Sequence, residues 1–185
     1  MVNVAPIHPT PMLRGNDRWE WPDPSPDGRR LAGSRIVDGG SELVVVDLAS
    51  GDEQVLDTVL ERLAVRWSPD GAWIAWSSPP RPVDSKSSGV WVVRVADGER
   101  RRLAADGSWA AWDTDGRHLI FARYGNNSGL WRVSVDGGPA ERLYEPDRRM
   151  WDYHIYGLDI ARSSSAMIVR LESATATLYV LENHD

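Results

Sequence analysis

Histidine and cysteine, the residues that most often carry metal or nucleophilic chemistry, are few and scattered in this sequence. There is no cysteine, which excludes disulfides and thiolate chemistry. The four histidines are His8, His118, His154 and His184. No two of them stand two or four positions apart, so the sequence lacks the local histidine pair found in many zinc sites. We therefore predict no metal site.

The sequence also lacks the motifs of common catalytic and nucleotide-binding sites. It contains no Gly-x-Ser-x-Gly elbow, no Gly-x-Gly-x-x-Gly and no P-loop lysine motif. Several carboxylates stand beside glycine, where a tight turn requires that pair. These are Asp27, Asp70, Asp97, Asp115 and Asp136. We predict no catalytic residue and no cofactor.

Tryptophan is the residue type in this chain that favours binding. The sequence has ten tryptophans and a single phenylalanine. Broad aromatic side chains form platforms for sugars and peptides and are common at binding hot spots. The same side chains also fill cores, so the elements that carry them decide between the two interpretations.

Those elements come from a repeat. Residues 68–71 (Ser-Pro-Asp-Gly) predict a tight turn, and residues 72–76 (Ala-Trp-Ile-Ala-Trp) predict the strand that follows. Related turn sequences occur at 25–28 and 113–116, and a diverged copy that has lost both Asp and Gly occurs at 161–164. The aspartate position moves from Asp27 to Asp70, Asp115 and Ser163, in steps of 43, 45 and 48 residues. Short β-rich runs at such a period are typical of β-propeller blades.

We predict one all-β domain over residues 1–185, a β-propeller of about four blades of four antiparallel strands. The blades are expected at about 19–57, 63–104, 108–144 and 153–182, after an N-terminal arm at 1–18. The third strands align position for position: Leu43, Val90, Leu130 and Leu178 share one site. Segment 52–63 also fits a helical period, but we predict a strand there because the other repeats place one.

The last repeat ends before its outer strand. Residues 2–5 (Val-Asn-Val-Ala) are the expected donor, so the N-terminal strand would complete the last blade and close the ring. Three arrangements stay open. The chain forms a four-bladed ring as a monomer, two chains pair into an eight-bladed ring, or it is part of a larger assembly.

The form Ser-Pro-Asp-Gly-x-x-Ile-Ala-Trp at 68–76 resembles the WD-like repeat of TolB-type propellers. The same repeat occurs in the propellers of prolyl-oligopeptidase-like enzymes and of bacterial sensor proteins, and the resemblance covers roughly residues 19–182. It implies a scaffold or binding role and carries over no set of site residues. TolB-type rings usually have six or more blades, whereas four are counted here.

In a propeller the first strand of each blade lines the central channel. Residues on or near these strands are the candidates for contact with a partner: Trp19, Trp21, Arg66, Trp109, Trp151, Tyr153 and His154. The other six tryptophans recur at matching repeat positions, so we interpret them as packing between blades. These are Trp67, Trp73, Trp76, Trp91, Trp112 and Trp131.

Charge and hydropathy limit the classes of partner that the chain is expected to bind. A net charge of −6 argues against nucleic acid, and no apolar run approaches the roughly 20 residues of a membrane helix. The location is cytoplasmic if Met1 is the native start, or periplasmic if an export signal was removed.

We predict a non-catalytic scaffold that binds another protein through one face or the channel mouth. The alternatives are a small-molecule or carbohydrate sensor with its ligand in the channel and, more weakly, an enzyme or hydrolase accessory using channel carboxylates with His154.

Overall fold

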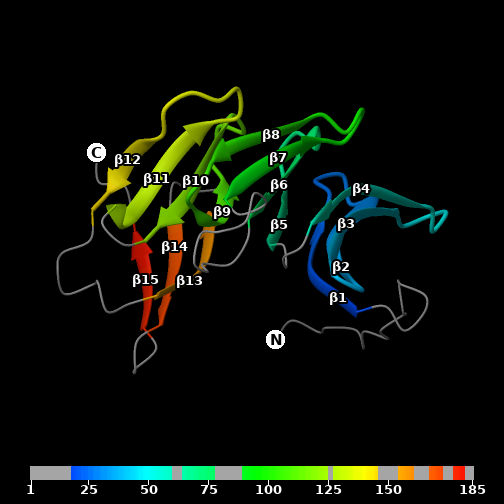
Figure 1. The fold of residues 1–185 in the computed structure, drawn as a ribbon, viewed down its shortest axis with the longest axis horizontal. Coiled ribbons are helices and arrows are strands. Elements are labelled where there is room, and N and C mark those ends of the chain that lie inside the picture. Colours follow the sequence, from blue (N-terminus) through cyan, green and yellow to red (C-terminus); the bar gives the residue numbers. More distant parts are fainter. Residues whose placement is uncertain are drawn as a thin grey trace, which may run out of the picture.

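A computed structural model of the protein describes residues 18–59, 64–77, 89–124, 127–145, 154–160, 167–172 and 177–181. Within these ranges the chain forms four antiparallel sheets that follow one another in an arc (Figure 1). The described residues include no helix long and apolar enough to cross a membrane. The predicted all-β propeller fold is confirmed.

Each sheet takes its strands in chain order, so each is a simple meander. Blade 1 contains β1 (Arg18–Pro24), β2 (Arg30–Val37), β3 (Gly40–Asp47) and β4 (Glu53–Val59). Blade 2 contains β5 (Ala64–Trp67), β6 (Trp73–Ser77), β7 (Val90–Arg94) and β8 (Arg100–Ala104). Blade 3 contains β9 (Ser108–Trp112), β10 (His118–Arg123), β11 (Gly129–Ser134) and β12 (Glu141–Tyr144). In blade 4 the described strands are β13 (His154–Ile160), β14 (Met167–Glu172) and β15 (Thr177–Leu181).

The ambiguous segment that begins near residue 52 is a strand, β4, as predicted. The predicted closure of the ring by residues 2–5 lies outside the described residues. The same holds for any outer strand of blade 4 beyond β15, so closure stays a prediction.

The turn between the first two strands of a blade explains why the repeat keeps Ser and Asp-Gly. In blade 2, the Ser68 hydroxyl donates to Asp70 Oδ1 at 2.6 Å and accepts from the Trp73 backbone N–H at 2.9 Å. Gly71 has φ +71°, a left-handed conformation that L side chains rarely adopt. Ser25 and Asp27 make the same bond in blade 1 at 2.6 Å. The Asp-Gly pairs therefore serve as turn chemistry, as predicted.

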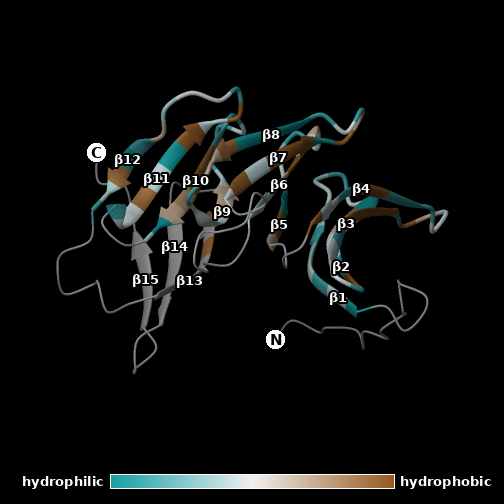
Figure 2. Ribbon diagram, in the orientation of Figure 1, coloured by the Kyte–Doolittle hydropathy of each residue, from teal (hydrophilic) through white to brown (hydrophobic). Residues whose placement is uncertain are grey.

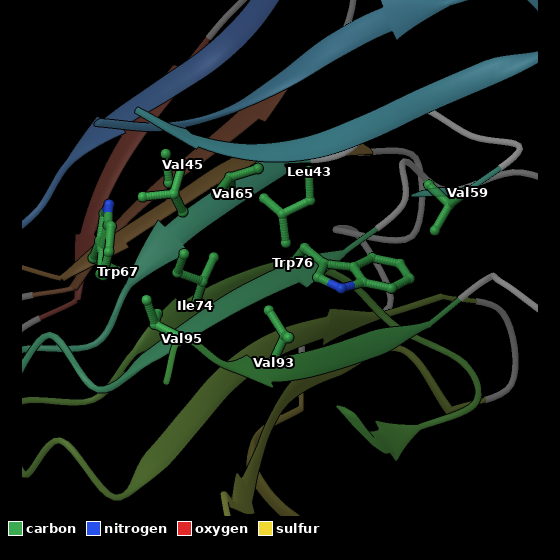
Figure 3. Close-up of a cluster of buried hydrophobic side chains, with 10 residues drawn as sticks. Leu43, Val45, Val59, Val65, Trp67, Ile74, Trp76, Val93 and Val95 are labelled. Atoms are coloured by element: carbon green, nitrogen blue, oxygen red, sulfur yellow. The ribbon is translucent and has the colours of Figure 1, made fainter. Parts of the chain in front are cut away.

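Neighbouring blades pack through buried apolar side chains. Figure 3 shows the cluster between blades 1 and 2, where Leu43 and Val45 of β3 face Ile74, Trp76 and Val93 of blade 2. Full burial of a side chain of this size contributes about 1.5–3 kcal/mol. Hydrophobic stretches lie within strands such as β3 and β7, and many of the turns are hydrophilic (Figure 2). A similar cluster joins blades 2 and 3 through Phe121, and a smaller one joins blades 3 and 4.

The outer strands of consecutive blades are linked by arginine. Arg100 of β8 reaches the buried carboxylate of Asp57 in β4, with Nη1 and Oδ1 2.5 Å apart. Arg101 of β8 reaches Asp136, just beyond β11, at 3.4 Å. At the other side of the blades, β1 lies beside β5, β5 beside β9 and β9 beside β13. These four inner strands therefore follow one another along the inside of the arc, and they position the site.

Candidate functional site

A cavity of about 500 Å³ lies where the inner strands of all four blades end. It is therefore at the channel mouth on the side of the first turn of each blade. Its described polar lining comprises Asp23, Arg66, Asp113 and Thr114. The broad apolar walls are formed by Trp67, Trp112 and Ile160.

Two hydrogen bonds hold consecutive blades together at the cavity wall. The Asp23 carboxylate of blade 1 accepts from the Trp67 backbone N–H of blade 2 at 2.7 Å. Trp112 Nε1 of blade 3 donates to the Arg66 carbonyl of blade 2 at 3.0 Å. These bonds join neighbouring blades rather than strands of one sheet, so they hold the inner strands of blades 1, 2 and 3 together beside the cavity.

The polar lining comes from positions where the repeats diverge. Counted from the turn, one position holds Asp23 in blade 1, Arg66 in blade 2 and Ala111 in blade 3. The turn position that is Ser68 in blade 2 is Asp113 in blade 3. The backbone conformation at the channel mouth thus recurs from blade to blade, whereas the side chains at these positions differ in charge and polarity.

The aspartate at the blade 3 turn has its own counter-charge. Arg132 Nε donates to Asp113 Oδ2 and its Nη2 to Asp115 Oδ2, both at 2.8 Å. His118 Nδ1 lies 2.6 Å from the same Asp115 Oδ2. Burial raises the pKa of Asp115, but hydrogen bonds from the Arg117 backbone and from His118 outweigh burial and hold this pKa below its usual value. Asp113 therefore shares the single positive charge of Arg132 with Asp115 and Glu141.

Arg66 differs from the half-buried arginines Arg35 and Arg132, which form ion pairs. Its Nη1 donates to the Val65 carbonyl at 2.8 Å, and among the described residues no carboxylate lies within ion-pair distance. By contrast, Arg35 pairs with Glu42 and Arg132 with Asp113, each at 2.8 Å. A guanidinium stays protonated at any physiological pH. The cavity lining therefore holds the Arg66 guanidinium together with two carboxylates, Asp23 and Asp113, without a direct ion pair between Arg66 and either of them.

Two of the predicted site tryptophans meet across the inner strands. The rings of Trp21 in β1 and Trp109 in β9 are in edge-to-face contact, with centroids 6.4 Å apart and planes at 88°. Both have positive φ, 46° and 55°, which costs a residue other than glycine about 1–2 kcal/mol. Each lies where the pairing of its strand shifts register. Such bulges re-aim side chains, and here both point their rings toward one another.

The tryptophan pair lies next to the cavity along the same strands. Trp21 directly precedes Pro22, and Trp109 stands two residues before Ala111; Pro22 and Ala111 both line the cavity. Blade 2 separates blades 1 and 3 in the arc, so the pair joins two blades that are not consecutive. Neither tryptophan belongs to the described cavity lining.

The remaining predicted site residues lie elsewhere. Trp19 packs over Gly33 of blade 1, where an added Cβ would come within 3.0 Å of its ring, and Arg35 lies 5.6 Å from the Trp19 centroid. His154 begins β13, with Glu172 opposite it in the backbone register. Trp151 and Tyr153 lie outside the described residues.

The structure thus places one predicted residue, Arg66, in the cavity lining and brings two others, Trp21 and Trp109, into contact elsewhere on the inner strands. The sequence interpretation did not select Asp23, Asp113 or Thr114. Asp113 and Thr114 carried a visible signal, because they replace the Ser-Pro of blade 2. Trp67 and Trp112, interpreted as packing residues, belong to the apolar clusters and also line the cavity. Within the described residues, no group of three or more histidines and carboxylates is arranged to hold a metal ion.

No family model matches this chain, and no curated protein matches it in sequence. Solved structures do match it. A putative TolB from Agrobacterium tumefaciens superposes with a TM-score of 0.70 at 20% identity, covering 86% of this chain and 59% of that one. TolB from Acinetobacter baumannii gives 0.65 at 16% identity, covering 92% and 45%. The fold is that of a TolB-type β-propeller.

The TolB-type fold also carries enzymes. An oligogalacturonate lyase in complex with manganese matches with a TM-score of 0.70 at 16% identity, covering 92% of this chain and 52% of that one. The chain spans about half to three-fifths of the length of these three structures. At these identities the likeness establishes the fold alone.

Proposed function

We propose that this chain is a non-catalytic TolB-type propeller scaffold that binds another protein at the channel-mouth cavity. The observation that carries this proposal is the divergence of the cavity lining over a repeated backbone. Asp23, Arg66 and Asp113 differ from their counterparts in neighbouring blades, although turns and strands recur. Side chains that depart from a repeat and converge on one cavity are typical of a binding site grafted on a scaffold.

The states of the polar groups favour binding over acid–base catalysis. Asp23 accepts a hydrogen bond from the Trp67 backbone, and Asp113 is paired with Arg132. Arg66 does not exchange protons at neutral pH. These groups suit recognition by charge and shape.

The second candidate is a sensor for a small molecule. The cavity volume of about 500 Å³ falls within the range of small-ligand pockets, roughly 300–1,000 Å³. A metabolite bound there would raise the melting temperature by mass action without any protein partner.

Site-specific photo-crosslinking tests the first candidate. A photoreactive amino acid at Thr114, which lines the cavity, is compared with one at Ser50, exposed in the β3–β4 turn of blade 1. We expect a protein adduct from position 114 only, and its loss when Arg66→Ala is added. Adducts of equal yield at both positions, or an adduct that survives Arg66→Ala, would contradict the proposal.

A further inference from the structure

We propose that the Asp38-Gly39 turn, at the tip of the β2–β3 hairpin, is a modification site at which aspartate converts to isoaspartate through a cyclic imide. This turn lies at the other end of the blade 1 strands from the first turn and the channel mouth. The inference is therefore independent of the proposed function. It follows from a comparison of all seven Asp-Gly pairs in the chain.

The reaction needs only the turn itself and water. The Gly39 nitrogen attacks Cγ of the protonated Asp38 carboxyl, and the new C–N bond closes a succinimide ring. The carboxyl O–H leaves and takes the amide proton with it as water. Water then opens the ring at either carbonyl. Opening at the side-chain carbonyl restores aspartate, whereas opening at the main-chain carbonyl gives isoaspartate, in which the chain runs through Cβ and Cγ.

The attacking nitrogen is engaged in five of the other six Asp-Gly pairs. In each of these five turns the glycine N–H donates to a backbone carbonyl at 2.9–3.0 Å. The glycines are Gly28, Gly71, Gly98, Gly116 and Gly137. Such a bond holds the peptide plane of the glycine, so its nitrogen cannot turn toward the aspartate side chain until the turn opens.

Four of these turns also hold the carboxylate. Oδ1 of Asp27, Asp70, Asp97 and Asp115 accepts the backbone N–H two residues further on, at 2.8–3.1 Å. Hydrogen bonds to the ionised form favour that form, as in Asp27, where the Ser25 hydroxyl and the Arg29 N–H lower the pKa. The ring-closing step requires the protonated form, so these bonds oppose it.

The last two pairs have other partners. Asp136 lies 3.4 Å from the Arg101 guanidinium, which also favours the ionised carboxylate. Asp106 pairs with Arg123 at 3.1 Å. The glycine after it, Gly107, is closely packed, because an added Cβ would come within 2.5 Å of the Phe121 ring. This packing leaves the main chain little room to form a ring.

Asp38 and Gly39 have none of these restraints. Both residues are exposed, and a Cβ added to Gly39 would meet no atom within 4 Å. Within the part of the chain that the structure describes, neither the Asp38 carboxylate nor the Gly39 N–H has a hydrogen-bond partner. This is therefore the Asp-Gly pair at which both reacting groups can move.

The conversion would act on blade 1 through its hairpin. The β2–β3 pairing continues to Val37 opposite Gly40, which leaves only two residues in the loop. Isoaspartate adds one carbon to the main chain of that loop, so the Val37–Gly40 pair is the first that it disturbs. The two strands lie at the centre of the blade 1 sheet.

Incubation of the full chain in mildly acidic buffer tests the inference, because the acid form of the carboxyl is the one that loses water. Electron-transfer fragmentation of its peptides distinguishes isoaspartate from aspartate at each pair. We expect isoaspartate to accumulate about tenfold faster at Asp38 than at Asp70 or Asp115, whose turns must open first. In urea the three positions should react at similar rates. Equal rates at the three positions in the folded chain would overturn the inference, as would unmodified Asp38 there after an incubation that converts it in urea.

A methyltransferase specific for isoaspartyl groups gives an independent measurement. It transfers a labelled methyl group from S-adenosylmethionine to the free carboxylate of isoaspartate, so the incubated wild-type chain should be labelled. Asp38→Ser removes the reacting carboxyl and should lose most of the label. The matched control is Asp52→Ser, exposed in the β3–β4 turn of the same blade and followed by Glu53 instead of glycine. Full labelling of Asp38→Ser, or an equal loss in Asp52→Ser, would overturn the inference.

Discussion

In blade 2 the first turn is closed by Ser68, whose hydroxyl bonds both Asp70 and the Trp73 backbone. In blade 3 a carboxylate, Asp113, stands at the same position, and the backbone turn is unchanged, with the Gly116 N–H donating to the Asp113 carbonyl at 3.0 Å. The strand opposite has changed as well, because Arg132 of β11 replaces Val92 of β7. A turn of one shape is thus built by a serine–aspartate pair in one blade and by an ion network around Arg132 in the next. The second solution adds charge at the cavity without altering the fold.

The packing position shared by the two blades gives the largest expected effect. Trp76 in β6 and Phe121 in β10 occupy equivalent sites and are buried, at 2% and 0% exposure. Replacing either by alanine leaves a large cavity, and we expect each to cost about 3–5 kcal/mol in urea denaturation. The matched control is Trp73→Ala, whose ring is half-buried between Arg94 and Arg101. A loss below about 1 kcal/mol at Trp76 or Phe121 would show that the two sites are not equivalent.

The ion network of blade 3 gives the next effect. Arg132→Val restores the residue type of blade 2 but leaves Asp113 and Asp115 without their shared cation. We expect a loss of about 1–2 kcal/mol, since the network is only partly buried. The double variant Asp113→Ser with Arg132→Val rebuilds the serine–aspartate turn of blade 2 and should recover most of that stability. If the double variant is no more stable than Arg132→Val alone, the two substitutions are independent and the comparison fails.

A smaller effect is expected from the serine–aspartate turn of blade 2. Ser68→Ala removes an acceptor from the Trp73 backbone N–H at a buried position. The unsatisfied donor should cost about 1 kcal/mol. Chemical denaturation checks this, with Ser50→Ala in an exposed turn as the control. A change no larger than that of the control would contradict a structural role for the Ser68 hydroxyl.

The smallest expected effect concerns the stability of the folded protein at acidic pH. The pKa of Asp115 is lowered on folding from the usual 3.8, so its ionised form stabilises the folded state above that value. This contribution is lost as the pH falls through the folded pKa. Asp115→Asn should therefore flatten the decline in stability between about pH 4 and pH 2, by less than about 1 kcal/mol at this partly exposed site. If stability declines in parallel in the variant and the wild type, Asp115 does not contribute to the acid dependence of stability.

The parts of the fold that were predictable are those fixed by local chemistry. An Asp-Gly pair requires a left-handed glycine, and alternating apolar residues define strand faces, so the turn at Gly71 and the strands beside it followed from a few neighbouring residues. The recurrence of this unit then indicated the arc of blades. The strand at β4 followed from the repeat even though its own sequence was ambiguous.

The site was harder to predict because its contacts span blades. Asp23 meets the Trp67 backbone across 44 residues of sequence, and the approach of Trp21 to Trp109 depends on two bulges with positive φ on non-glycine residues. No local pattern signals such a bulge. Arg66 was predicted to lie on an inner strand, whereas its lack of a carboxylate partner depends on how the blades pack.

The ion pair of Arg100 with Asp57 joins blades 1 and 2 at their outer strands, β8 and β4. At their inner strands the same two blades are joined by the hydrogen bond from the Trp67 backbone N–H to Asp23. Moving the outer strands apart would leave the Asp57 carboxylate, which is 3% exposed, buried without its cation. Such an isolated buried charge is strongly unfavourable, so the pair resists opening of the two blades at their outer edge.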